Sequence, residues 1–191
     1  MNTAQTVELY TTGLASGAAG ELGAFTPTEL HLARLSRASA IITSLPDVTD
    51  VLDIGCGKAL LYGYLPKSVR YTGIDPVPEL VRYAHENGLG DAVSLCSVED
   101  APTSMKAQMV VSLGVLSHID ASDLMTFLAA CALLAHTYIL IEGQDPDVYA
   151  GKFCSHSAQE VSKCLHALGF VDLRYDPPAY GDSSYRLLGI R

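Results

Sequence analysis

Short runs of apolar residues recur along the chain from Asp50 to its end, and stretches with helical spacing separate several of them. Each run is four to six residues long, the length of a buried strand, and glycines, prolines or polar residues bound it. The runs cover residues 51–54, 69–74, 92–96, 109–113, 138–141, 170–175 and 185–190. Continuous apolar strands are buried on both faces, so they predict an α/β fold with a doubly wound, mostly parallel, seven-stranded sheet.

The helical stretches lie where such a fold needs its connections. Residues 59–65, 79–86 and 121–135 have helical spacing, and Asp120 is the expected cap of the third stretch. Ser157 and Glu160 form a capping box that opens a further helix, which Gly169 ends. The alternation of strand and helix therefore places helices on both faces of the predicted sheet.

Residues 1–45 lack the strand pattern and are predicted to be helical. Thr26 and Glu29 form a capping box with proline at the first helical position, which predicts a helix over residues 27–44. A weaker helix is expected over residues 3–15, before a glycine-containing stretch. We expect one domain over residues 1–191, with residues 1–45 as a helical lid and residues 50–191 as the sheet core.

The turn after the first predicted strand carries two glycines, Gly55 and Gly57. Such a pair allows a tight turn and a close approach of the backbone to a ligand. The dinucleotide pattern fails because Leu60 replaces its third glycine, and the phosphate-loop pattern fails because Ala59 follows Lys58. Asp53 precedes the turn, where a carboxylate repels a pyrophosphate but attracts an ammonium or a sulfonium. The turn therefore favours a ligand with a cationic end.

A second acid, Asp75, ends the second predicted strand, twenty residues after Gly55. A carboxylate at this place can accept hydrogen bonds from both hydroxyls of an adenosine ribose. Each acid also has a structural interpretation. Asp75 could cap a helix or form a turn before Pro76, and Asp53 could be a solvated charge at a strand end.

With these residues in place, the chain resembles the class I S-adenosylmethionine-dependent methyltransferases, which have a Rossmann-like fold, from about Asp50 to its end. The resemblance implies that the glycine turn holds the methionine part of the cofactor, Asp53 its amino group and Asp75 its ribose. It extends to the adenine-binding stretch at residues 96–102 and to the fourth-strand motif at residues 109–118. The cofactor-binding residues that it implies are Asp53, Gly55, Cys56, Gly57, Asp75, Pro76, Ser97, Val98, Glu99, Ser112 and Leu113.

Three positions depart from the family pattern. Gln108 replaces a frequent acid before the fourth strand, which puts a helper role there in doubt. Ala59 replaces a frequent glycine, and Ser97 stands where an acid often meets the adenine amine. These two departures suggest a modestly altered affinity for the cofactor.

Charge and composition narrow the partners. The net charge is −9, and the twelve Lys and Arg residues are scattered, which disfavours nucleic acid and anionic membranes as partners. The longest apolar run, residues 127–135, is too short to cross a bilayer, and the first residues lack a secretory signal. Five cysteines without a Cys-x-x-Cys pair favour reduced thiols and a cytoplasmic location, and no metal site is expected.

The expected reaction is the in-line transfer of a methyl group to an O, N or S atom of a neutral or cationic small molecule. Alignment of the acceptor supplies most of the catalysis, and a base helps where the acceptor must lose a proton. His118, after the fourth predicted strand, and Tyr10 and His31, in the N-terminal helices, are the catalytic candidates. Each also has a structural interpretation: Tyr10 and His31 as groups packed under a lid helix, and His118 as the cap of the following loop.

Two other functions stay open on the sequence alone. The chain could bind S-adenosylmethionine without turnover, or it could be an oxidoreductase with a nucleotide cofactor. The missing third glycine and the charge of Asp53 count against the oxidoreductase.

Overall fold

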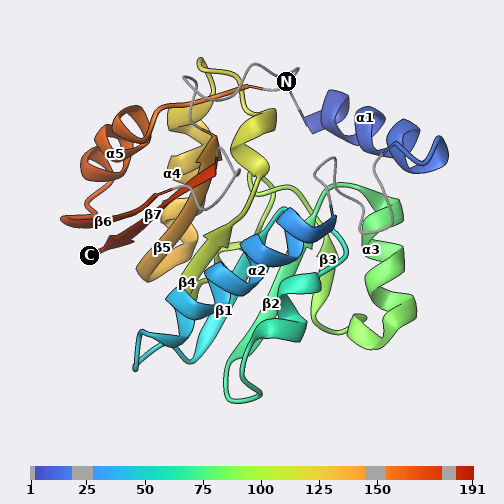
Figure 1. Cartoon of the computed structure of the whole chain (residues 1–191), viewed down its shortest axis with the longest axis horizontal. Coiled ribbons are helices and arrows are strands. Elements are labelled where there is room, and N and C mark those ends of the chain that lie inside the picture. Colours follow the sequence, from blue (N-terminus) through green and yellow to red (C-terminus); the bar gives the residue numbers. More distant parts are fainter. Residues whose placement is uncertain (1–2, 19–27, 145–153, 178–183) are drawn as a thin grey trace. The chain divides into compact units, whose positions relative to one another are not determined.

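The computed structural model of the chain describes residues 3–18, 28–144, 154–177 and 184–191. Its internal contacts define two compact units, an N-terminal unit (Thr3–Ser97) and a C-terminal unit (Val98–Arg191). Strands of both units are drawn as arrows in Figure 1.

The N-terminal unit combines two long helices with three parallel strands. The strand order is β3-β2-β1, and β2 pairs in parallel with both neighbours. The elements are α1 (Thr3–Ala15), α2 (Thr28–Thr43), β1 (Asp50–Ile54), the 3-10 helix η1 (Leu60–Tyr64), β2 (Arg70–Asp75), α3 (Pro78–Ala84), the π-helical turn η2 (His85–Leu89) and β3 (Val93–Leu95).

The C-terminal unit contains four strands in the order β4-β5-β7-β6. β4 and β5 are parallel, whereas β7 runs antiparallel to both β5 and β6, and Figure 1 shows β5, β7 and β6 side by side. The elements are η3 (Thr103–Met105), β4 (Ala107–Ser112), η4 (Val115–His118), α4 (Leu124–Leu134), β5 (Ala135–Gln144), α5 (Ala158–Ala167), β6 (Asp172–Asp176) and β7 (Ser184–Ile190).

The seven predicted strands are present: three parallel strands in the N-terminal unit, and four strands in the C-terminal unit, where the antiparallel β7 makes the pairing mixed. The core positions of β1, β4 and β5 are apolar and buried, which is why their continuous apolar runs identified them. The predicted fold class is therefore confirmed.

Both N-terminal helices are also present. α1 has the predicted bounds, and α2 begins within one residue of its predicted start, although the capping residue Thr26 lies outside the described residues. The capping box that opens α5 is confirmed. The Glu160 N–H donates to Ser157 Oγ (3.2 Å), and the Ser157 N–H donates to Glu160 Oε2 (2.9 Å). Gly169 ends this segment with φ +90°, a conformation that favours glycine.

The helical stretch predicted over residues 59–65 is present as the 3-10 helix η1. Ala59 has a left-handed φ of 58°, and the Tyr62 N–H bonds back only three residues, to the Ala59 carbonyl. One local prediction is wrong. Asp120 does not cap α4, whose cap position is Asp123. Instead, the Asp120 carboxylate accepts a hydrogen bond from the Cys154 thiol (3.3 Å).

β5 is longer than its predicted four residues, because it begins at Ala135 and continues through Glu142 to Gln144. A charged residue normally ends an apolar strand pattern. Here Arg186, the register partner of Glu142 on β7, pairs with its carboxylate, so the strand stays buried. Among the described residues, the helices are all too short or too polar to cross a membrane.

Candidate active site

In the N-terminal unit, the turn after β1 folds back over the carboxyl end of β2. The N–H groups of Gly55 and Cys56 both donate to the Ile74 carbonyl, at 2.8 and 3.1 Å. Gly55 and Gly57 have φ values of +71° and +56°, a region that side chains disfavour. The two glycines are therefore required by the backbone path that carries the turn to Asp75.

Asp75 accepts a hydrogen bond on each of its carboxylate oxygens. The Gly57 N–H donates to Oδ2 (2.8 Å) and the Val77 N–H donates to Oδ1 (2.9 Å). Burial raises the pKa of this carboxyl to about 6, and these two hydrogen bonds act against the shift. Asp75 is thus a turn residue, as its structural interpretation expects, and it also fastens the glycine turn to the end of β2.

Asp53 is only 4% exposed, so its interpretation as a solvated strand-end charge is wrong. Its Oδ2 accepts a hydrogen bond from the Tyr71 hydroxyl (2.8 Å). Burial raises its pKa to about 7, the Tyr71 hydrogen bond lowers it, and the charge of Asp75 raises it further. The two acids therefore belong to one electrostatic cluster of the N-terminal unit.

Tyr71 is a site residue that the sequence analysis missed. Tyr71 lies on β2 opposite Val51 of β1. Asp53 is two residues after Val51 on β1, so its side chain points to the same face of the sheet. That spacing was the available signal, but it needs the register of β1 and β2, which the sequence does not show. The Tyr71 ring also meets Tyr62 edge to face, with centroids 5.7 Å apart.

Cys56 fills the space beside Gly73. A Cβ at Gly73 would come within 2.8 Å of Cys56 Sγ and 3.0 Å of the Tyr71 hydroxyl, so glycine is needed there. Burial raises the pKa of the Cys56 thiol well above its usual range, and the charge of Asp53 raises it further. The Cys56 thiol is therefore neutral and packs in the turn. The predicted site residue Pro76 directly follows Asp75 in the chain.

The N-terminal helices bring Tyr10 into this cluster. Burial raises the pKa of the Tyr10 hydroxyl, and the charge of Asp75 raises it further. The Thr11 hydroxyl, next in α1, donates to Glu79 of α3 (3.1 Å). His31 is half-buried on α2, and Ser97 is half-buried at the end of the unit.

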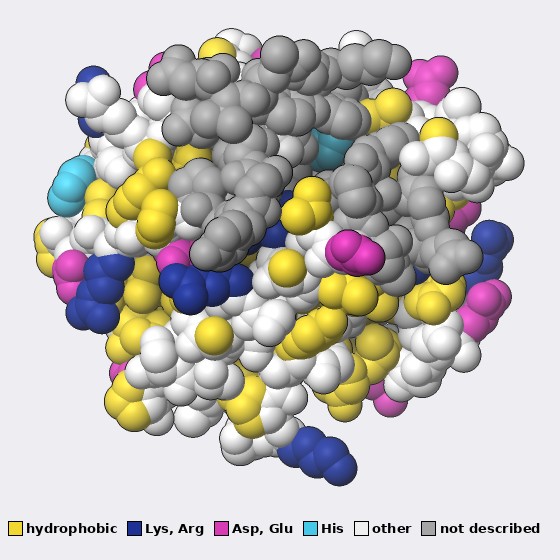
Figure 2. All heavy atoms as spheres, viewed as in Figure 1, with side chains coloured by type: hydrophobic (Ala, Val, Ile, Leu, Met, Phe, Trp, Pro, Cys, Tyr) yellow, Lys and Arg dark blue, Asp and Glu magenta, His cyan; other side chains and the backbone are white. Residues whose placement is uncertain are grey.

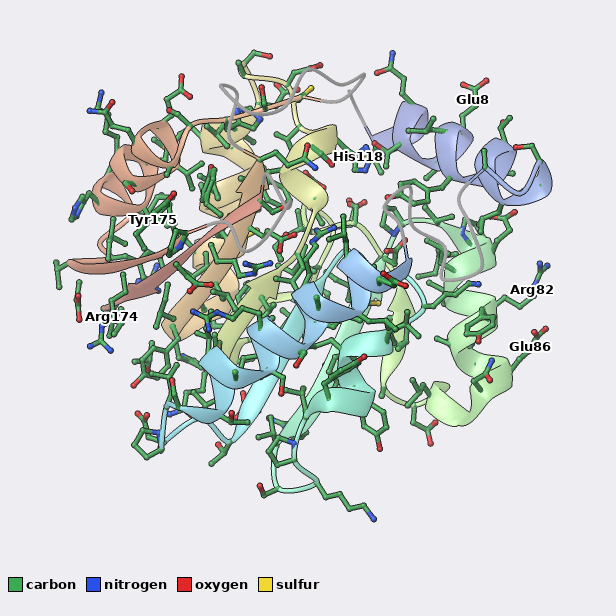
Figure 3. All side chains as sticks on the ribbon, viewed as in Figure 1. Glu8, Arg82, Glu86, His118, Arg174 and Tyr175 are labelled. Carbon is green, nitrogen blue, oxygen red and sulfur yellow. The ribbon has the colours of Figure 1, made fainter. Side chains whose placement is uncertain are left out.

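The C-terminal unit holds the other predicted residues. Val98 is buried and Glu99 is exposed, ahead of β4. Ser112 ends β4 with its hydroxyl fully buried and with no hydrogen-bond partner among the described residues, and Leu113 beside it is half-buried. His118 ends η4, is 6% exposed and is labelled in Figure 3.

Burial lowers the pKa of His118 to about 4. The imidazole is therefore neutral at pH 7 and can accept a proton or a hydrogen bond. The structure thus gathers Asp53, Cys56, Gly57 and Asp75 in one unit, and Ser112 and His118 on one β4–η4 stretch of the other. Among the residues it describes, no group of three His, Cys, Asp or Glu side chains could hold a metal ion.

Known proteins share this architecture. The family model of the methyltransferase domain matches residues 51–136 of the chain. No curated protein matches the chain.

Three solved structures resemble the whole chain. Magnesium protoporphyrin IX methyltransferase from Synechocystis PCC 6803, with bound S-adenosylmethionine, has a TM-score of 0.78 at 16% identity, over 100% of this chain and 98% of that one. A methyltransferase from Leishmania major that depends on S-adenosylmethionine has a TM-score of 0.75 at 18% identity, over 99% and 82%. The 1,6-didemethyltoxoflavin N1-methyltransferase from Burkholderia thailandensis, with bound 1,6-didemethyltoxoflavin and S-adenosylhomocysteine, has a TM-score of 0.70 at 22% identity, over 98% of this chain and 88% of that one.

The family resemblance predicted from the sequence is therefore confirmed, and so is the Rossmann-like fold. The prediction of a methyltransferase domain, with S-adenosylmethionine as the cofactor of its family, is also confirmed. The part played by each site residue remains a prediction.

Proposed function

We propose that the chain is a class I S-adenosylmethionine-dependent methyltransferase that methylates a small molecule on an O, N or S atom as a single functional domain. The observation that carries this proposal is the acid pair at the glycine turn. Asp53 and Asp75 are both buried, and their hydrogen bonds come from neutral groups, the Tyr71 hydroxyl and two backbone N–H groups.

The pair fits the cofactor on electrostatic grounds. Burial raises the pKa of Asp53 to about 7 and that of Asp75 to about 6. No cationic side chain is among their hydrogen-bond donors in the described residues. A ligand with an ammonium and a sulfonium would favour the charged carboxylates, which the protein interior disfavours. A pyrophosphate would do the opposite, and this counts against a nucleotide-cofactor oxidoreductase.

Asp53, with Gly55, Cys56 and Gly57, would hold the methionine part of the cofactor, and Asp75, with Pro76, would hold the ribose. Asp75 already accepts two hydrogen bonds, so it can exchange the Gly57 N–H for ribose hydroxyls. Ser97, Val98 and Glu99 would meet the adenine, and Ser112 and Leu113 would line the end of β4. When bound, S-adenosylmethionine supplies a methyl group already activated on a sulfonium.

The chain's own contribution to transfer is alignment and exclusion of water. Holding the acceptor in line can be worth about 7–11 kcal/mol. His118 is buried and neutral, so it can accept a hydrogen bond or a proton from an acceptor hydroxyl or amine. Tyr10 and His31 would act from α1 and α2, which we propose to be the lid of the site.

The charge pattern supports a small acceptor over a polyanion. The chain has 21 acidic and 12 basic residues. On the described part of the face in Figure 2, Lys and Arg side chains are interspersed with acidic and apolar ones. Nucleic acid recognition needs clustered basic groups. The five free cysteines fit a reducing compartment, and we place the enzyme in the cytoplasm.

Turnover on an acceptor panel tests this function. Purified protein is incubated with S-adenosylmethionine and a set of phenols, amines, thiols and tetrapyrroles, and S-adenosylhomocysteine formation is measured. We expect turnover on at least one acceptor and a loss in kcat of about a hundredfold in His118→Ala, with unchanged cofactor affinity. Tight cofactor binding without turnover on any acceptor would instead support a binding module. A loss of stability in His118→Ala that matches its loss of rate would support a structural imidazole.

A further inference from the structure

In the C-terminal unit, the segment just before α5 holds the segment that carries His118. The Cys154 N–H donates to the Ser117 carbonyl (2.8 Å), and His156 Nε2 lies 2.7 Å from the Ile119 carbonyl. A carbonyl can only accept, so Nε2 carries the proton and donates it. The carbonyls on both sides of His118 are thus held by one short stretch, residues 154–156.

His156 is itself anchored to the sheet. The Tyr185 hydroxyl of β7 donates to the His156 carbonyl (2.6 Å). The Tyr185 ring lies over Gly143 of β5, its register partner, where a Cβ would overlap the ring and hydroxyl. Glycine at position 143 therefore makes room for the tyrosine that fixes His156.

The three residues linked by these contacts are all buried: Tyr185 is 0% exposed, His156 3% and His118 6%. Inside a protein, hydrogen bonds of this kind are strong and their loss leaves unsatisfied groups. A hydrogen bond to the residue next to His118 therefore restrains the backbone from which the imidazole projects.

We propose that His156 is a positioning residue that sets the place of His118 through the Ile119 carbonyl, with Tyr185 and Gly143 as its support on the sheet. This proposal rests on the proposed function for its catalytic consequence, because His118 is the candidate acceptor-side group. The positional claim itself concerns only contacts within the C-terminal unit.

The His156 side chain contacts the Ile119 carbonyl through one N–H group, so its positioning role can be tested by replacing that donor. His156→Leu removes the donor and keeps a similar size. His156→Gln is the matched control, because its amide nitrogen is also at the ε position and can donate to the Ile119 carbonyl. A generic packing role would respond to both replacements alike.

The measurement is the titration of the His118 ring, followed by NMR in the cofactor-free protein. Asp120, the charged residue two positions from His118, and the neutral Cys154 thiol that donates to it are unchanged in these variants. The wild-type ring should titrate near pH 4, as burial dictates. In His156→Leu the titration should move up by about one pH unit or more, because a released segment lets water reach the ring. His156→Gln should titrate like the wild type.

An unchanged His118 titration in a folded His156→Leu protein would overturn the proposal, and so would equal shifts in the Leu and Gln variants. If His156→Leu does not fold, Tyr185→Phe serves instead. It removes only the hydroxyl that donates to the His156 carbonyl, and it should shift His118 in the same direction; an unchanged titration there overturns the proposal.

Failure of the proposed function would be seen separately. S-adenosylmethionine binding to the wild type is measured by calorimetry on the same samples. Absence of binding would remove the methyltransferase proposal but leave the His118 titration as a test of the contacts. If an acceptor is turned over, His156→Leu should lower kcat about tenfold or more in the wild type and have no further effect in His118→Ala.

Discussion

Each compact unit contains a pair of neighbouring carboxylates, but the two pairs are held in different ways. In the N-terminal unit, Asp53 and Asp75 accept hydrogen bonds from a tyrosine hydroxyl and from backbone N–H groups. In the C-terminal unit, Arg186 pairs with Glu142 (2.9 Å) and with Asp176 (3.5 Å). These three residues lie opposite one another on β5, β7 and β6.

The difference separates a structural charge cluster from a ligand-binding one. The charge of Glu142 is balanced within the chain by a guanidinium that is 1% exposed. The charges of Asp53 and Asp75 meet only neutral donors in their hydrogen bonds, and their pKa values are raised to about 7 and 6. A cationic ligand would balance the charges of Asp53 and Asp75, whereas Arg186 already balances the charge of Glu142.

The largest effect should come from breaking the balanced cluster. Arg186→Met leaves the buried Glu142 carboxylate and the half-buried Asp176 carboxylate beside an apolar group, and the loss of the cation costs about 3–5 kcal/mol. The melting temperature should fall by roughly 10 °C or more in scanning calorimetry. Glu142→Gln in the same protein should restore part of the loss. A melting temperature unchanged by Arg186→Met would show that the cluster does not stabilise the sheet.

The next largest effect concerns the cofactor. Asp75→Ala removes hydrogen bonds from a charged acceptor, each worth about 1.5–3 kcal/mol. S-adenosylmethionine affinity should fall roughly ten- to a hundredfold by titration calorimetry. Asp172→Ala is the control, since this exposed acid of β6 pairs with Arg174 on the surface and should leave the affinity unchanged. An equal affinity in Asp75→Ala would place the ribose elsewhere.

The smallest effect is expected for Asp53→Asn, which should raise stability at high pH but lower the cofactor affinity. Burial raises the pKa of Asp53 from 3.8 to about 7, so its favourable contribution to stability is present below about pH 4 and is lost as the pH rises toward 7. Asp53→Asn should therefore melt a few degrees higher than the wild type at pH 8, but not at pH 4. Its cofactor affinity should be lower at pH 8.

Thermal melts of cofactor-free protein at both pH values check this result. Asp50→Asn is the matched control, because Asp50 lies on the same strand and its half-buried carboxylate forms an ion pair with the exposed Arg70. A destabilised Asp53→Asn at pH 8 would mean that the Asp53 charge is already balanced in the folded chain.

The predictable part of the molecule depends on short-range patterns. Strand β4 was visible because Met109, Val110 and Val111 form a continuous apolar run. Asp53 and Asp75 were visible because the first lies within such a run and the second ends one. The capping box of Ser157 and Glu160 is likewise complete within four residues.

The missed parts depend on residues far apart in the sequence. The end of β5 was hidden because Glu142 looks like a strand breaker until Arg186, more than forty positions later, lies opposite it. The role of Tyr71 required the register of β1 and β2. Asp120 looked like a helix cap because nothing near it in sequence shows that Cys154 would bond to its carboxylate.

Calorimetric titration of the wild-type protein with S-adenosylmethionine, S-adenosylhomocysteine and NAD tests the central claim most directly. The acid pair at the glycine turn predicts saturable binding of the first two compounds, with a raised melting temperature, and no response to NAD. Binding of NAD with no response to either sulfur compound would contradict the assignment of Asp53 and Asp75 to a cationic methyl donor.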